Sequence, residues 1–207
     1  MKLTYKKVFF VFLFIIININ AMFESQPVRS CQSCFSMRLA SPEDIDAIMA
    51  LDISISEEYF KPLLLQYPEF EGKEQDVIKL LADEVESDIT WFASCIALEK
   101  QQCLYVADNN TAIVGFVACH QQDDVIVVID LLMIDKNCRG KGTGKQLIKS
   151  CIQTFPRAST CMLVVLDNNQ LARTAYEKMG FVLMDEKPLF VQEKYPESRY
   201  ICYSLSC

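Results

Sequence analysis

Histidine is nearly absent from this sequence, since His120 is the single histidine among 207 residues. A structural zinc site normally needs two cysteine pairs, or one pair together with two histidines. Cys31 and Cys34 form one CxxC pair, and no second CxxC accompanies it. We therefore predict no metal site and interpret the pair as incidental, with a disulfide or a redox pair as the alternatives.

Positive charge is scarce as well, because 20 Lys and Arg stand against 27 Asp and Glu, for a net charge of −7. Binding to nucleic-acid phosphates requires clustered Lys and Arg, so we predict no nucleic-acid partner. An acidic protein suits a cationic ligand such as an amine, although the same charge also serves ordinary solubility.

The apolar run at the amino terminus is too short to cross a bilayer comfortably, which takes about 20 residues. It extends from Val8 to Ile17 after three lysines, and Ala21 offers a small residue for cleavage. This arrangement is typical of a secretory signal. We therefore predict a signal-like or anchor-like segment over residues 1–21, with membrane contact through residues 8–17 as an open alternative.

Residues 22–36 are polar and show little periodicity, so we predict a linker there and a folded domain over residues 37–207. Half of the chain is apolar (51%), which allows a sizeable core. Four of the ten cysteines fall within apolar or periodic runs, where a free cysteine behaves as a small hydrophobe; these are Cys103, Cys119, Cys151 and Cys161. Whether the first 36 residues are cleaved, anchoring or a mis-assigned start stays open.

Apolar patterning predicts an alternating order of strands and helices in the second half of the domain. Ser41, followed by Pro42 and two acids, begins a helix, and residues 53–102 are mostly helical. We predict strands over residues 37–39, 103–107, 112–119, 125–134, 161–166, 181–184 and 200–205, and helices over residues 142–155 and 171–179. A loop with Pro188 and Pro196 joins the last two strands. This order indicates a mixed α/β sheet with helices on both faces.

One strand carries a charge among apolar residues. Residues 125–134 are apolar nearly throughout, which is typical of a central strand covered on both sides, and Asp130 is the one charge inside it. A carboxylate there is costly unless it is hydrogen-bonded or functional, so Asp130 is a candidate base, with a structural role as the alternative. His120, at the end of another strand, is a second candidate, although such a histidine is more often an exposed turn residue.

A glycine-studded turn lies between this strand and the next helix. Gly140, Gly142 and Gly144 let the main chain approach a ligand closely, and the first amides of a helix favour a pyrophosphate. Positive charge is added by Arg139, Lys141 and Lys145. The turn is therefore a candidate phosphate site.

Two common phosphate motifs do not fit this turn. A P-loop would need glycine in place of Arg139 and Ser or Thr in place of Gln146. A dinucleotide fingerprint needs Gly-x-Gly-x-x-Gly, whereas the three glycines are evenly spaced. The pattern that fits is Arg-x-x-Gly-x-Gly.

Two patterns together resemble the signature of the GNAT superfamily of N-acetyltransferases. The first runs from Arg139 to Gly144, and the second runs from Asn169 through Tyr176 to Gly180-Phe181. The resemblance covers about residues 37–205, with its weakest part at residues 53–102. It implies a mixed, mostly antiparallel central sheet with splayed central strands and helices on both faces. It also implies acetyl-CoA as the co-substrate.

The resemblance further implies roles for individual residues. Main-chain groups of the long strand would pair with the pantetheine, amides of the turn would hold the pyrophosphate, and Asn169 would hydrogen-bond the pantetheine arm. The predicted cofactor-binding residues are Leu132, Met133, Ile134, Arg139, Gly140, Lys141, Gly142, Thr143, Gly144, Lys145 and Asn169. Tyr176 is the predicted general acid, or else one more residue of the apolar face. Asp130 lies where some superfamily members carry a glutamate base, and Cys138 lacks a partner base for a nucleophile role.

We therefore predict an enzyme that transfers the acetyl group of acetyl-CoA directly to a primary amine, on a small molecule or on a protein or peptide. A non-catalytic acyl-CoA-binding regulatory module and an exported interaction protein are the alternatives. Because acetyl-CoA is a cytoplasmic metabolite, we expect a cytoplasmic protein, with export or membrane tethering as the alternative. A homodimer stays open.

Overall fold

The computed structural model of the protein describes residues 35–97, 101–194 and 199–207. The predicted signal-like segment, the linker up to residue 34 and the Cys31–Cys34 pair lie outside the described residues. Within the described ranges, no helix combines the length and the apolar character that crossing a membrane requires.

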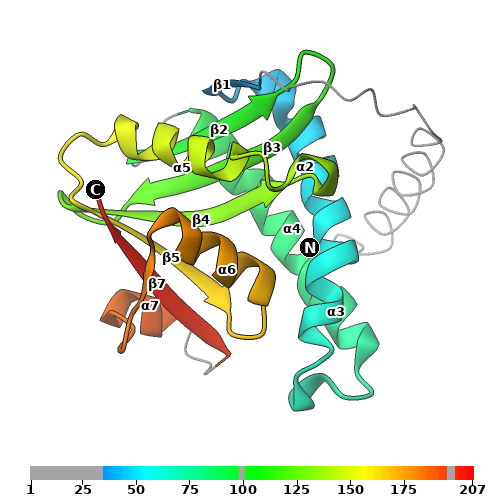
Figure 1. Cartoon of the computed structure of the whole chain (residues 1–207). Coiled ribbons are helices and arrows are strands. Elements are labelled where there is room, and N and C mark those ends of the chain that lie inside the picture. The colour runs from blue at the N-terminus through cyan, green and yellow to red at the C-terminus, as the bar shows by residue number, and fades with distance from the viewer. Residues whose placement is uncertain (1–34, 98–100, 195–198) are drawn as a thin grey trace, which may run out of the picture. The chain divides into compact units, whose positions relative to one another are not determined.

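The described strands form one seven-stranded sheet in the order β1-β2-β3-β4-β5-β7-β6 (Figure 1). They are β1 (Ser36–Leu39), β2 (Gln102–Asp108), β3 (Ile113–Gln121), β4 (Ile126–Ile134), β5 (Thr160–Leu166), β6 (Val182–Leu183) and β7 (Tyr200–Ser206). Every neighbouring pair is antiparallel except β4 and β5, which run parallel. The predicted mixed, mostly antiparallel sheet is confirmed, and the strand that carries Asp130 lies at its centre.

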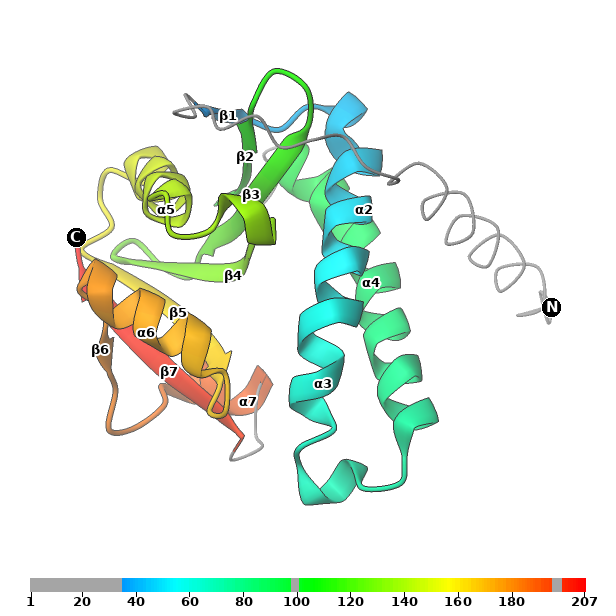
Figure 2. The same ribbon diagram turned by 45° about the vertical axis from the view of Figure 1, so that its right-hand side comes forward.

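Helices cover both faces of this sheet, as the sequence predicts. One face carries α5 (Thr143–Thr154) and α6 (Gln170–Met179), and the other carries α2 (Ile45–Ile55) and α4 (Glu74–Ile96), as Figures 1 and 2 show. The sheet is therefore the middle layer of three.

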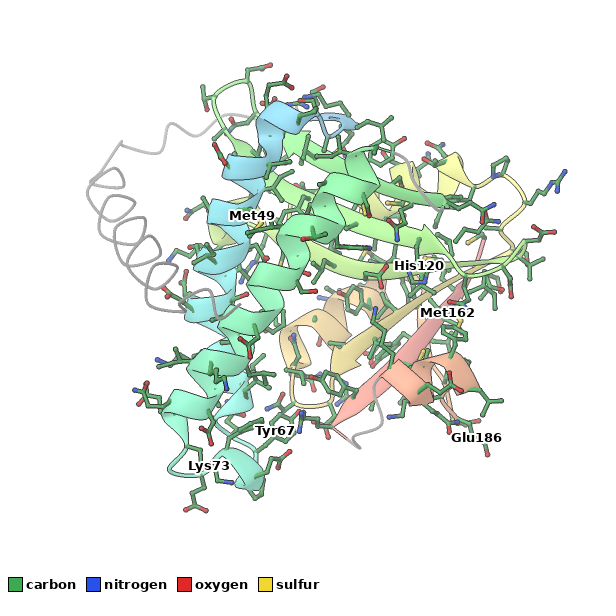
Figure 3. All side chains as sticks on the ribbon, turned by 180° about the vertical axis from the view of Figure 1, so that it is seen from behind. Met49, Tyr67, Lys73, His120, Met162 and Glu186 are labelled. Carbon is green, nitrogen blue, oxygen red and sulfur yellow. The ribbon has the colours of Figure 1, made fainter. Side chains whose placement is uncertain are left out.

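Alternating side chains of the central strands fill the two cores. In β5, Cys161 and Leu163 pack in the cluster that includes Leu147 of α5. Met162, between them, packs with Val191 of α7 (Leu189–Lys194) on the opposite face. Figure 3 views this second face, with His120 and Met162 labelled.

Three cysteines meet under α5 as free thiols. Cys103 and Cys119 are directly paired across β2 and β3, with their Sγ atoms 3.1 Å apart, and the Sγ of Cys151 lies 3.6 Å from that of Cys103. All three are fully buried among apolar residues. They act as small core hydrophobes, as their place in apolar runs indicates.

The prediction of a mostly helical segment over residues 53–102 is confirmed up to Ile96, whereas Gln102 already belongs to β2 and residues 98–100 lie outside the described residues. α2 continues into a π-helical turn, η2 (Ser56–Phe60), and then into α3 (Lys61–Leu64). A short 3-10 helix, η3 (Pro68–Phe70), separates α3 from α4. π-Turns within helices often coincide with functional positions.

The prediction of a plain loop between the last two strands is wrong. The carbonyl of Pro188 accepts the N–H groups of Val191 and Gln192, each at 2.9 Å, so α7 begins directly after this proline. A proline has no N–H to contribute, but the start of a helix does not need one. β6 is also shorter than the predicted 181–184, since it spans only Val182–Leu183, and the neighbouring Phe181 is buried at 3% exposed.

A charged pair joins β1 to the helix that follows it. Arg38 donates to both carboxylate oxygens of Asp44, over 2.7 and 2.9 Å. The same carboxylate accepts the main-chain N–H of Ser41 at 2.8 Å, at the start of η1 (Pro42–Asp44), which leads into α2. The hydrogen bond from Arg38 holds the pKa of Asp44 well below its usual range.

We expect Asp44→Asn to lower the free energy of unfolding by about 1–2 kcal/mol at neutral pH, because it removes charge-assisted bonds at a helix start. A carboxyl group with a lowered folded-state pKa stabilises above its unfolded pKa of about 4 and loses this contribution as the pH falls through the folded value. Urea unfolding should therefore show the difference shrinking as the pH falls below about 4. Asp46→Asn, on the exposed side of α2, is the control and should change little. A difference that is independent of pH would contradict the assignment.

Candidate functional site

β4 and β5 part in the middle of the sheet. They pair over Ile126–Ile129 and Thr160–Leu163, and beyond these residues they diverge, as Figure 2 shows. The edge of β4 over residues 130–134 that faces β5 therefore has no partner among the described strands. Its main-chain N–H and C=O groups are available to an extended polar ligand.

A β-bulge at Asp130 bends β4 where the parallel pairing ends. β3 pairs Ala118 with Leu131 and the next residue, Cys119, with Ile129. Asp130 is thus the extra residue of the bulge. A bulge bends its strand and increases the local twist, which carries β4 away from β5.

The turn after β4 presents open main-chain amides at the start of α5. Gly140 and Gly142 have φ angles of 73° and 82°, a conformation that glycine adopts without strain. The first helical amides, from Thr143 onward, precede the internal hydrogen bonds of the helix and carry its positive end. Lys141 and Lys145 are exposed beside them. This arrangement fits a diphosphate.

Arg139 has a different role from the lysines of this turn. Its Nε donates to the carbonyl of Ile134 at 3.0 Å. Its guanidinium carbon lies 5.3 Å from the ring centre of Tyr59, in η2. The side chain therefore braces the end of β4 against η2.

η2 also joins the segments that follow the two diverging strands. The hydroxyl of Tyr59 donates to Oδ1 of Asn169, after β5, at 2.9 Å. Glu58 accepts from Nζ of Lys136 at 2.7 Å, in η5 (Lys136–Cys138) after β4. The sequence predicts neither contact, because the partners are far apart along the chain.

Asn169 caps α6 as well as binding Tyr59. Its Oδ1 also accepts the main-chain N–H of Ala172 at 3.0 Å, and the residue is 3% exposed. Because the oxygen already accepts two hydrogen bonds, the NH₂ group is the part of this amide that suits a ligand acceptor.

Tyr176 lies on the α5 and α6 face, in the hydrophobic cluster that includes Leu132 and Ile134. Its ring centre lies 5.8 Å from that of Phe181 and 6.4 Å from that of Tyr203. Burial raises the pKa of Tyr176 to about 12. The phenol therefore keeps its proton at neutral pH.

Asp130 lies on the other face of the sheet, between two partners. Its Oδ2 is hydrogen-bonded to Nδ1 of His120 at 2.5 Å, and its Oδ1 accepts from Nζ of Lys194 at 3.0 Å. The carboxylate side chain is 9% exposed. Burial alone would lower the pKa of His120, but the hydrogen bond and charge of Asp130 outweigh it and raise that pKa.

The expectation that His120 is an exposed turn residue is therefore wrong. His120 lies within β3, its side chain is 24% exposed, and Figure 3 shows it on the face that α4 and α7 cover. Its partner Asp130 is ten residues ahead on the next strand. The β3–β4 register brings the two candidate bases together.

Two further carboxyl groups face this region, and the sequence reasoning misses both. Asp52 of α2 is 1% exposed and is hydrogen-bonded to Asp88 of α4. Burial raises the pKa of Asp88 to about 6, and the charge of Asp130 adds to the rise. The sequence could have marked Asp52, because this residue follows Ile48 by four positions and so places a carboxylate on the apolar face of α2.

A cavity of about 130 Å³ lies beside this polar group. It is lined by His120, Asp130 and Lys194, and by Ile129 and Val164 on the two sides of the point where the strands part. The cavity therefore adjoins the apex of the divergence, on the face opposite α5 and α6.

The predicted site residues thus fall into three places. Main chain of Leu132–Ile134, the turn from Arg139 to Lys145, and Asn169 surround the space between β4 and β5. Tyr176 packs with Leu132 and Ile134 on one face of the sheet, and Asp130 lies beside the cavity on the other face.

A family model described as an acetyltransferase (GNAT) domain matches residues 78–193, more than half of the chain. An uncharacterized N-acetyltransferase from Methanocaldococcus jannaschii is 32% identical over 82 residues. That match covers 38% of this chain and 52% of the relative, so the chain spans about half of that protein's length.

Solved acetyltransferase structures share the fold. The crystal structure of PaiA N-acetyltransferase from Thermoplasma acidophilum, in complex with coenzyme A, has a TM-score of 0.65 at 13% identity, over 84% of this chain and 99% of that one. An acetyltransferase from Streptococcus agalactiae has a TM-score of 0.60 at 16% identity, over 84% of this chain and 98% of that one. At these identities the likeness establishes the fold.

We expect Asn169→Ala to lower the free energy of unfolding by about 1–3 kcal/mol, because it removes the cap of α6 and the acceptor of Tyr59. Tyr59→Phe should cost about 1 kcal/mol alone and much less in the Asn169→Ala background, since the lost hydrogen bond is shared. Urea unfolding of the single and double variants measures this coupling. Tyr105→Phe, whose hydroxyl is bonded to Thr154 far from η2, should instead be additive with Asn169→Ala. If Tyr59→Phe and Asn169→Ala were also additive, the result would contradict a stabilising hydrogen bond between Tyr59 and Asn169.

Proposed function

The chain belongs to the GNAT acetyltransferase family, and we propose that it transfers the acetyl group of acetyl-CoA directly to a primary amine. The observation that carries the proposal is the junction of the unpaired edge of β4 beyond Ile129 with the first turn of α5. An extended pantetheine arm can pair with the first while its diphosphate binds the second. The acceptor is an amine of a small molecule or of a protein or peptide.

In this proposal each part of coenzyme A meets a suitable group. Main-chain groups of Leu132 to Ile134 pair with the pantetheine, and the NH₂ group of Asn169 donates to it. Amides of the glycine turn bind the diphosphate, and exposed Lys141 and Lys145 add positive charge. The positive φ of Gly142 supports this role, because it turns the chain directly into the helix.

The amine attacks the thioester carbonyl without an acyl-enzyme. A C–N bond forms, the C–S bond breaks, and the departing thiolate takes up a proton. Tyr176 donates that proton, and its packing with Leu132 and Ile134, on the α5 and α6 face at the end of β4, supports the role.

An ammonium group must lose a proton before it can attack. Asp130 and His120 form the proton-accepting pair, with the carboxylate orienting the imidazole through Nδ1 and stabilising its positive charge. Their position on the face opposite Tyr176 supports this division of roles. The acid has to reach the leaving sulfur, whereas the base has to reach the incoming nitrogen.

Three carboxyl groups lie on the proposed acceptor side. Asp52, Asp88 and Asp130 reach it from α2, α4 and β4. Carboxylates attract a cationic acceptor and oppose an anionic one, and Lys194 offsets part of this charge through its contact with Asp130. The carboxyl groups support an amine as the acceptor.

We expect the purified protein to release coenzyme A from acetyl-CoA when it is offered a panel of polyamines, aminoglycosides, amino acids and peptides. Gly142→Val should weaken acetyl-CoA binding at least about tenfold, because a branched side chain disfavours a φ of 82° and fills space beside the helix start. Calorimetry measures the binding, and thiol titration measures the release.

Gly72→Val is the matched control for this substitution. Gly72 has a φ of 70° and open surroundings, as Gly142 does, but lies between η3 and α4. It should bear the same backbone strain and bind acetyl-CoA normally. Retained binding in Gly142→Val would refute the proposed turn, and binding without thiol release over the whole panel would favour a non-catalytic acyl-CoA-binding module.

We expect Tyr176→Phe to lower turnover about 10²-fold, the usual contribution of a general acid, with little change in the affinity for acetyl-CoA. The ring contacts with Phe181 and Tyr203 remain. Tyr203→Phe is the control, because it removes a neighbouring hydroxyl that bonds Glu177; it should reduce stability and leave turnover largely intact. Equal turnover in Tyr176→Phe and the unaltered protein would remove Tyr176 from the mechanism.

A further inference from the structure

Lys194 places a primary amine of the chain itself beside Asp130. Its Nζ lies 3.0 Å from Oδ1 of a carboxylate that is 9% exposed. Two other described lysine pairs, Lys61 with Glu74 and Lys136 with Glu58, use carboxylates that are 60% and 56% exposed. The Lys194 side chain is itself 57% exposed, so the burial of its partner is what distinguishes this ion pair from the other two.

α7 is anchored so that Lys194 faces the cavity. Val191 is 2% exposed and packs in a cluster with Val128 and Met162 of the sheet. Phe190 precedes Lys194 by four residues, which places both on one side of the helix, and both line the cavity.

The amine lies close to the proposed reaction centre. The cavity is also lined by Ile129, the last residue of β4 that pairs with β5, and by Val164, the first residue of β5 beyond that pairing. Lys194 therefore reaches the apex of the divergence from the side on which the proposed acceptor enters. Its ammonium occupies the contact with Asp130 that an external amine would need.

We propose that Lys194 is an internal acetyl acceptor, so that the protein acetylates itself when it binds acetyl-CoA; this rests on the proposed acetyl transfer. The Asp130–His120 pair takes one proton from the Lys194 ammonium, and the neutral Nζ attacks the thioester carbonyl. The N–C bond forms, the C–S bond breaks, the thiolate is protonated, and the second nitrogen proton passes to solvent. The products are Nε-acetyl-lysine and coenzyme A.

The modification alters the acceptor side. Acetyl-lysine carries no charge, so its ion pair with Asp130 is lost and the carboxylate is left to an external ammonium. Self-acetylation therefore opens the acceptor position to other amines.

The test follows a heavy-isotope acetyl group. The full chain is first treated with a broad lysine deacetylase, then incubated with heavy acetyl-CoA without an amine, digested and quantified by tandem mass spectrometry. We expect Lys194 to be labelled at least about tenfold faster than the exposed Lys73 and Lys149, because a positioned amine reacts at a high effective concentration. The rate per molecule should not depend on protein concentration.

Two variants sharpen the result. Asp130→Asn should remove the preference for Lys194. Intact-mass measurement of Lys194→Arg should show no acetyl group taken up in the same interval.

If Lys194 were labelled no faster than Lys73, the proposal would be overturned, because the labelling would then be ordinary chemical acetylation of exposed amines. A rate that rises with protein concentration would overturn it too, because transfer would then occur between molecules. If either of these results were obtained but an added amine still released coenzyme A, the proposed acetyl transfer would stand and only self-acetylation would fall. If the protein did not bind acetyl-CoA, both the proposed function and self-acetylation would be refuted.

Discussion

The parting of β4 from β5 after Ile129 is the constraint on which the rest of the site depends. A parallel ladder cannot continue past a bulge that bends one strand away. Beyond the bulge β4 stays paired with β3, but its main-chain groups on the β5 side lack a strand partner, and buried main-chain groups are costly unless something satisfies them. The fold thus holds an extended polar edge ready for a ligand and directs it toward the positive end of α5.

A gap between two strands needs supports at its open end, and η2 provides them. Its side chains contact Asn169 beyond β5 and both Arg139 and Lys136 beyond β4. Together these contacts connect both sides of the gap to one helical segment. The same segment begins with α2, whose buried Asp52 belongs to the acidic face. The supports of this gap and part of the proposed acceptor side therefore belong to one continuous piece of chain.

The two faces of the sheet divide the chemistry. The α5 and α6 face offers a protonated phenol, Tyr176, within an apolar cluster. The α4 and α7 face offers carboxyl groups, His120 and the ammonium of Lys194. In the proposed reaction one face supplies the acid for the leaving group and the other supplies the base for the nucleophile. The carboxyl groups of this face affect one another: burial raises the pKa of Asp88, and the charge of Asp130 adds to the rise.

The sequence by itself determined the order of the strands and of the helices other than α7, the glycine turn with its helix start, and the central position of the strand around Asp130. These features depend on neighbours within one strand or one helical turn, so apolar periodicity and glycine spacing record them. Tertiary structure decided that His120 faces Asp130, that Lys194 reaches the same carboxylate from 64 residues away, and that Tyr59 meets Asn169 across 110 residues. Those contacts depend on strand register, on one bulge and on how a short helix packs, which are sums of many weak interactions between distant residues and leave no local pattern to be read.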